Sequence, residues 1–122
     1  MPLPPGYEMR LEQRLRLWMK MHDVQPPPEA EMRCLLELAL EVSERSPASG
    51  PLTAGLVAAV VGPAYFWADG PFHPYFRRYV ETCLAGGRPT LGIDLTPGAP
   101  AAAEQMPPEL IGKLKEFLHS MT

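Results

Sequence analysis

The chain has 122 residues, 46% of them hydrophobic, which is enough for one globular domain with its own core. Its formal net charge of −3 gives no general attraction to nucleic acid. Proline, with 16 residues, is well above its usual share of about 5%, and most prolines separate stretches with helical periodicity. We therefore expect a compact all-α bundle of about four helices, with one short extended segment and a C-terminal amphipathic helix on a linker.

The N-terminal part predicts two helices joined by a Pro-rich connection. Residues 1–6 form a Pro-rich lead that we expect to be flexible, and apolar residues recur every three or four positions from Tyr7 to Trp18. This helix must end before Pro26, because proline disfavours a helical conformation in the residue before it. The second helix can take Pro28 as its first residue, and its single charged stripe predicts burial of more than half of its circumference.

The stretch from Leu52 to Trp67 has no charged residue, and the rest of the chain is organised around it. It is apolar on all sides, which predicts a central helix that is buried on all sides. We expect this helix to begin near Pro51 and to run to about Val61, because Pro63 would then stop or kink it. A membrane-spanning helix needs about 20 apolar residues, so the interruption at Pro63 argues against a membrane segment.

The clearest amphipathic pattern follows a turn at residues 69–71. A helix can begin there at Pro71 or Pro74, since proline is tolerated in a first turn. The pair Gly86-Gly87 predicts its end, in the left-handed conformation that glycine adopts easily. The apolar stripe of this helix consists of Phe72, Tyr75, Phe76, Tyr79, Val80, Cys83 and Leu84.

The C-terminal third divides into three segments. Leu91 to Leu95 alternates apolar residues with others, which predicts a short extended segment. No partner strand is evident, so this segment would lie on the helices or pair with a strand of another molecule. Residues 96–108 predict a Pro- and Ala-rich linker, and residues 109–122 predict a docking helix. The helical domain itself would span residues 7–95.

The two cysteines, Cys34 and Cys83, do not form a CxxC motif. Each lies in an apolar pattern, which predicts buried, reduced thiols rather than a disulfide. The N-terminal residues contain no apolar signal region. Together these observations predict a cytoplasmic protein.

Aromatic residues are concentrated in one part of the chain, since seven of the ten lie between Tyr65 and Tyr79. Their spacing is consistent with core contacts between the helices on either side of the turn. Aromatic side chains around a turn can instead border a surface that recognises a partner. The residues nearest the turn are the candidates for such a surface: Phe66, Trp67, Phe72 and His73.

The C-terminal helix is the second candidate for partner binding. A helix of this length is marginal alone in water, so it needs a groove to pack into. It can fold back on its own domain, or it can bind a protein partner or a second copy of the chain, which the long linker favours. Its apolar candidates are Ile111, Leu114, Phe117 and Leu118.

The order of the predicted elements allows an alternative as a winged-helix-like DNA-binding regulator. In that case Arg77, Arg78 and Arg88 would contact nucleic acid. The acidic net charge, the long aromatic connection and the missing second wing strand argue against it.

Catalysis would require an acid, a base or a nucleophile that converge on one site. His22, His73 and His119 are scattered, and none has metal-ligand spacing to another His or Cys. No GxSxG, P-loop, GxGxxG or HExxH motif is present. We therefore predict a small non-enzymatic protein without metal or cofactor, an adaptor or assembly protein that binds a protein partner or itself, with a homodimer as one form.

Overall fold

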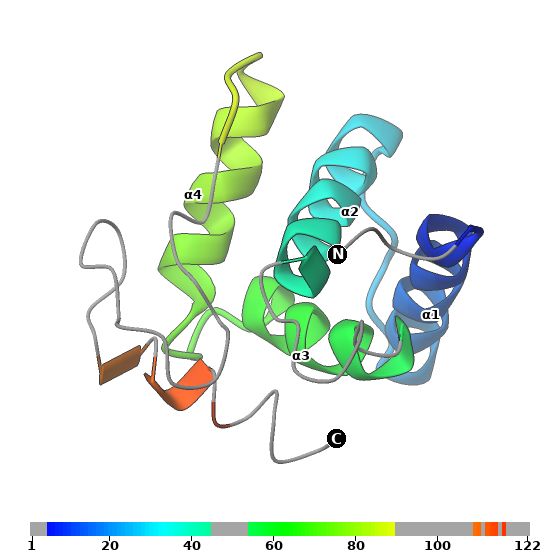
Figure 1. Ribbon diagram of the computed structural model, residues 1–122, viewed down its shortest axis with the longest axis horizontal. Coiled ribbons are helices and arrows are strands. Elements are labelled where there is room, and N and C mark those ends of the chain that lie inside the picture. The colour runs from blue at the N-terminus through cyan, green and yellow to red at the C-terminus, as the bar shows by residue number, and fades with distance from the viewer. Residues whose placement is uncertain (1–4, 45–53, 90–108, 111, 115, 117–122) are drawn as a thin grey trace.

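The computed structural model describes residues 5–44, 54–89, 109–110, 112–114 and 116 (Figure 1). These residues contain helices and no strand, and four helices pack together. They are α1 (Tyr7–Met21), α2 (Glu29–Glu44), α3 (Ala54–Phe66) and α4 (His73–Leu84). The predicted all-α bundle is therefore confirmed. The predicted extended segment and linker, residues 91–108, lie outside the described residues.

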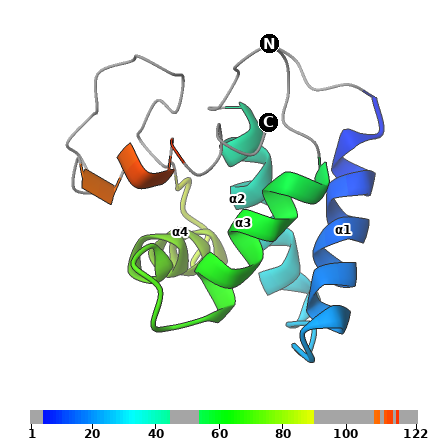
Figure 2. The same cartoon turned by 90° about the horizontal axis from the view of Figure 1, so that it is seen from below.

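Helix α3 is the central element, and it packs against all three of the other helices. In Figure 1 it lies below α2, reaches the lower part of α1, and leads through a turn into α4. Figure 2 shows it in front of α2, with α1 on one side and α4 on the other. The interface between α3 and α1 is the most extensive of the helix pairs.

The core follows the helical periodicity of the sequence. Leu11, Leu15 and Met19 of α1 are fully buried, whereas Leu17 and Met21 on its other side are largely exposed. The buried side of α2 covers more than half of its circumference, and its buried apolar residues are Met32, Cys34, Leu35, Leu36, Leu38, Ala39 and Val42. The largest fully buried side chains also include those of Tyr65 and Phe76.

Helices α1 and α3 approach closely because α3 carries glycine where they meet. A Cβ atom added to Gly62 would lie 2.7 Å from Cδ2 of Trp18, which is closer than carbon atoms can pack. The Trp18 indole therefore lies directly on the backbone of α3. The Arg14 side chain lies over Gly55 in a looser contact, with its Nε 3.9 Å from an added Cβ.

The prediction that the central helix runs only to about Val61 is wrong, because α3 continues through Pro63 to Phe66. A proline at this position removes one backbone hydrogen bond, the one to the carbonyl of Ala59. Ala59 is exposed, so water can satisfy its carbonyl and the cost of the missing bond is small. The Pro63 carbonyl still accepts a hydrogen bond from the Trp67 N–H at 3.0 Å.

Proline and glycine lie close to several helix ends, although not always at the predicted position: α4 begins at His73, between the two predicted starts at Pro71 and Pro74. Helix α2 begins one residue after Pro28, whose carbonyl accepts the first N–H of the helix ladder, from Met32, at 2.9 Å. Pro28 is thus the residue before the helix rather than its first residue. After α4, Gly86 has a φ of 87°, and its N–H donates to the Cys83 carbonyl at 3.0 Å.

The prediction of reduced cysteines is wrong, because Cys34 of α2 and Cys83 of α4 form a disulfide. Their Cα atoms are 5.8 Å apart, within the usual range for a disulfide. The bond joins residues 49 positions apart in the sequence. The apolar surroundings that predicted a thiol are those of the interface between α2 and α4, which brings the two sulfur atoms together.

Candidate functional site

The turn between α3 and α4 begins at Trp67 and is held by its own backbone. The Gly70 N–H donates to the Trp67 carbonyl at 3.1 Å, and the His73 N–H donates to the Gly70 carbonyl at 3.3 Å. Trp67 itself is bonded to the last turn of α3 through its N–H. The turn therefore keeps Trp67 at a defined position at the end of the central helix.

An apolar groove of about 320 Å³ lies between the end of α3 and this turn. It is lined by Ala59, Val60, Pro63, Ala64, Trp67, Asp69, Gly70, Pro71 and Phe72. Ala59 and Pro63 are four residues apart and so share one face of α3, and Trp67 follows directly after the end of the helix. We call this feature the α3 groove.

The α3 groove modifies the prediction that the central helix is buried on all sides. Val57, Val61 and Tyr65 are buried, as expected for a core helix. Ala59 is exposed and Pro63 is half-buried, so the opposite face is not covered by the described part of the chain. This face carries no charged residue of its own, which is unusual for a helix face in contact with water.

Four rings form a continuous cluster beside the groove: Trp18, His22, Phe66 and Trp67. The Trp67 ring lies 5.4 Å from Trp18 and 5.7 Å from His22, measured between ring centroids. Phe66 stacks with Trp18 at 6.1 Å. Trp67 is 45% exposed, so it belongs both to this aromatic cluster and to the wall of the groove.

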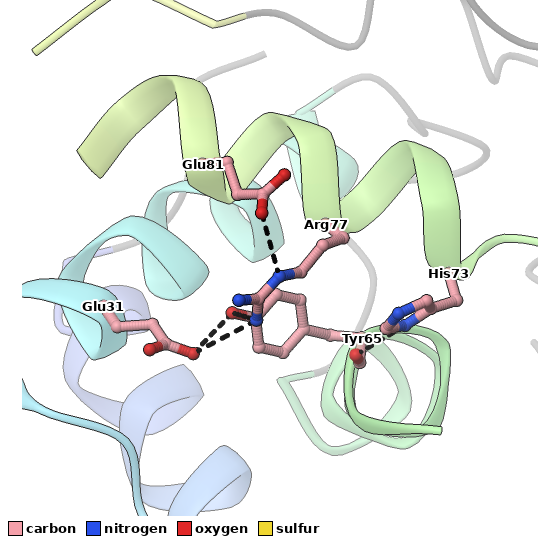
Figure 3. A network of polar contacts seen from close by, with 5 residues as sticks. All are labelled: Glu31, Tyr65, His73, Arg77 and Glu81. Atoms are coloured by element: carbon pink, nitrogen blue, oxygen red, sulfur yellow. Dashed lines mark hydrogen bonds and ion pairs between the residues drawn. The ribbon is translucent and has the colours of Figure 1, made fainter. Parts of the chain in front are cut away.

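The structure brings only two of the four residues predicted at the turn to the same groove. Trp67 and Phe72 line the α3 groove, whereas Phe66 packs in the aromatic cluster and against the core. His73 performs a different role, because its Nδ1–H donates to the Tyr65 carbonyl at 2.9 Å and holds the start of α4 to α3 (Figure 3). Sequence reasoning missed His22, which lies at the end of α1 and reaches Trp67 only through the packing of α1 on α3.

At the hydroxyl group of Tyr65, a network of polar side chains joins α2, α3 and α4 (Figure 3). The Tyr65 hydroxyl donates to Glu31 of α2 at 2.5 Å and accepts from Arg77 of α4 at 2.9 Å. Arg77 also pairs with Glu81, with Nε and carboxylate oxygen 3.4 Å apart. Burial raises the pKa of Tyr65, and the hydrogen bond to Glu31 raises it further, so the phenol stays protonated.

The arginines predicted for nucleic-acid contact have different surroundings. Arg77 is held in the network, and its guanidinium lies 5.6 Å from the centroid of the Tyr65 ring. Arg78 lies over the ring of Tyr75 on its own helix, at 5.9 Å. Arg88 is exposed beyond the end of α4. The three side chains are therefore not brought together by any described contact.

Only one of the four C-terminal candidates lies in the described part of the chain. Leu114 is fully buried and belongs to the hydrophobic core, and Leu110 is half-buried against that core. Ile111, Phe117 and Leu118 lie outside the described residues. In this conformation Leu114 is covered by its own domain.

The described residues contain no group of three or more His, Cys, Asp or Glu side chains that could hold a metal ion. None of the helices described is long and apolar enough to cross a membrane. Comparison with protein-family models, with curated proteins and with solved structures yields no match for this chain.

Proposed function

We propose that this chain is a small non-enzymatic protein-binding protein, of the adaptor or assembly type, and that the α3 groove is its recognition surface. The observation that carries the proposal is the groove itself, a concave apolar wall at the end of the central helix with Trp67 at its border. Concave apolar surfaces with an accessible aromatic side chain are typical of interface hot spots.

The exposed part of Trp67 can supply a useful share of the binding free energy. Its exposed fraction is 45%. An aromatic side chain can bury about 150–250 Å², so covering Trp67 would remove on the order of 100 Å² from water and favour binding by about 2–3 kcal/mol. The ring is already held against Trp18 and His22, so little side-chain entropy is lost when a partner covers it.

The burial of Leu114 favours the α3 groove over the C-terminal helix as the surface that binds a partner. Leu114 is buried in the core of its own domain, so a partner or second copy could take the tail only if Leu114 left that core. We therefore place partner binding at the groove, and homodimerisation there remains one form of it. DNA binding is the lesser proposal, because Arg77 is already paired with acidic residues.

The disulfide between Cys34 and Cys83 bears on the cellular compartment in which the protein acts. Disulfides persist in oxidising compartments and are rare in the cytosol. The bond between Cys34 and Cys83 therefore favours a site of action outside the reducing cytosol, against the cytoplasmic location predicted from the sequence.

The test is selection of a phage library of short random peptides on the full chain, compared with two matched variants. Ala59→Trp would fill the groove from an exposed position, whereas Gln13→Trp would add the same side chain at an exposed position of α1. Peptides should bind the wild type and Gln13→Trp and should lose binding to Ala59→Trp, with all three proteins folded by circular dichroism. Peptides that bind all three equally, or failure to select any, would refute the groove as the recognition surface.

A further inference from the structure

The α3 groove contains one charged group in an otherwise apolar wall. Among the described residues that line the groove, Asp69 is the only charged one, and it lies on the turn between α3 and α4. Its side chain is exposed, and within the described residues it takes part in no ion pair or side-chain hydrogen bond. Water therefore solvates this carboxylate in the unbound protein.

A partner that covers the groove would also remove water from the Asp69 carboxylate. A wholly apolar partner would remove water from the carboxylate without replacing its hydrogen bonds, which is costly for a charged group. An acidic partner would add repulsion. A cationic side chain would restore the lost interactions by a charge-assisted hydrogen bond. The carboxylate thus selects among partners that the apolar wall alone would accept equally well.

Trp67 offers a second feature that suits a cation. Cations favour the face of an indole ring over other aromatic rings. In the described residues, guanidinium groups lie over the rings of Tyr7, Tyr65 and Tyr75, supplied by Arg10, Arg77 and Arg78. No cation of the described chain lies over Trp67, although it is 45% exposed. Within the described residues, the ring best suited to a cation is thus exposed in the same groove as the carboxylate of Asp69, which has no ion-pair partner there.

We propose that the partner of the α3 groove is an apolar protein segment that carries one cationic side chain, arginine or lysine. Its apolar residues lie on Ala59, Pro63 and Phe72, the stem of its cationic side chain lies on Trp67, and its charged head pairs with Asp69. This rests on the proposed function and specifies the chemistry of the partner. The net charge of −3 also favours the approach of a cationic segment.

The experiment uses the peptides selected on the full chain, resynthesised in pairs that differ only in the basic residue, which is replaced by methionine in the second member. Binding of each pair is measured by fluorescence anisotropy to wild type, to Asp69→Asn and to Glu29→Gln. Glu29 is also exposed but lies at the start of α2 and does not line the groove, so its variant controls for the loss of one negative charge.

The selected peptides should contain a basic residue next to apolar ones. Asp69→Asn should weaken the basic peptide by about fivefold and leave the methionine peptide unchanged, as for a partly exposed ion pair. Glu29→Gln should change neither peptide. The affinity of the basic peptide should also fall with rising salt, and this dependence should be smaller with Asp69→Asn.

The outcomes separate this proposal from the one on which it rests. Peptides that Ala59→Trp blocks but that lack a basic residue, or that bind Asp69→Asn as tightly as wild type, would overturn the cationic partner and leave the groove in place. Peptides that Ala59→Trp does not block would overturn both. Equal weakening by Asp69→Asn and Glu29→Gln would mean that net charge, and not the groove, attracts the peptide, which also overturns the proposal.

Discussion

The disulfide between α2 and α4 makes a quantitative prediction about stability. The variant Cys34→Ala/Cys83→Ala removes the bond and leaves no polar group in its place. Cys34 is only 6% exposed, so alanine suits its surroundings better than serine would. The wild type in reducing buffer provides a second way to remove the same bond, without any change of residue.

The magnitude follows from the length of the loop that the bond closes. The cysteines are 49 positions apart. The chain-entropy relation for a loop of that length gives about 4 kcal/mol of stabilisation, near the upper end of the typical range of about 2–4 kcal/mol. The total stability of a domain of this size is about 5–15 kcal/mol, so the loss is a large fraction of it. The melting temperature should fall by roughly 10–20 °C.

The assay is equilibrium unfolding in urea, followed by circular dichroism and by the fluorescence of Trp18 and Trp67. Oxidised wild type should be the most stable sample, and reduced wild type should agree with the alanine variant. Alkylation of the unfolded, unreduced protein should modify no thiol, and alkylation after reduction should modify both. Two reactive thiols in the unreduced protein would show that the bond is absent, and equal unfolding free energies of oxidised protein and variant would refute the loop-entropy reasoning.

Four further substitutions test the packing and the site. Gly62→Ala should destabilise the protein by about 1–3 kcal/mol, because the new Cβ would lie 2.7 Å from the Trp18 ring; an unchanged urea midpoint would mean that the two helices do not meet there. Tyr65→Phe should cost about 1–2 kcal/mol at neutral pH through the loss of two hydrogen bonds. Because burial raises the pKa of Tyr65 above its ordinary value of 10.0, the unfolded state loses its proton first, so wild-type stability should fall above that pH more steeply than that of Tyr65→Phe. Leu114→Ala should cost about 2–5 kcal/mol if the tail completes the core, and a neutral result would place the tail outside it. Trp67→Ala should leave a cooperatively folded protein that no longer binds the selected peptides, and loss of folding would assign this side chain to the core instead.

Part of the candidate site could be predicted from the sequence. The concentration of aromatic residues around a Gly- and Pro-rich turn drew attention to Trp67 and Phe72, which line one groove in the structure; that this groove recognises a partner stays a prediction. It did not indicate that His73 would turn back to the Tyr65 carbonyl. Nor could it indicate that His22 would join the cluster, because that contact depends on where α1 ends relative to α3.

The sequence by itself determined the helices and most of their ends, because these depend on neighbouring residues. Apolar residues at helical spacing, prolines before helices and glycine after α4 act over a few positions in the chain. Only the tertiary structure decided which segments far apart in the sequence lie against each other. The disulfide, the passage of α3 through Pro63 and the open groove each depend on which helix lies beside which. Their physical causes are the distance between two sulfur atoms, the access of water to one carbonyl group and the lack, within the described residues, of an element that covers one face of α3. None of these is a property of a short stretch of sequence.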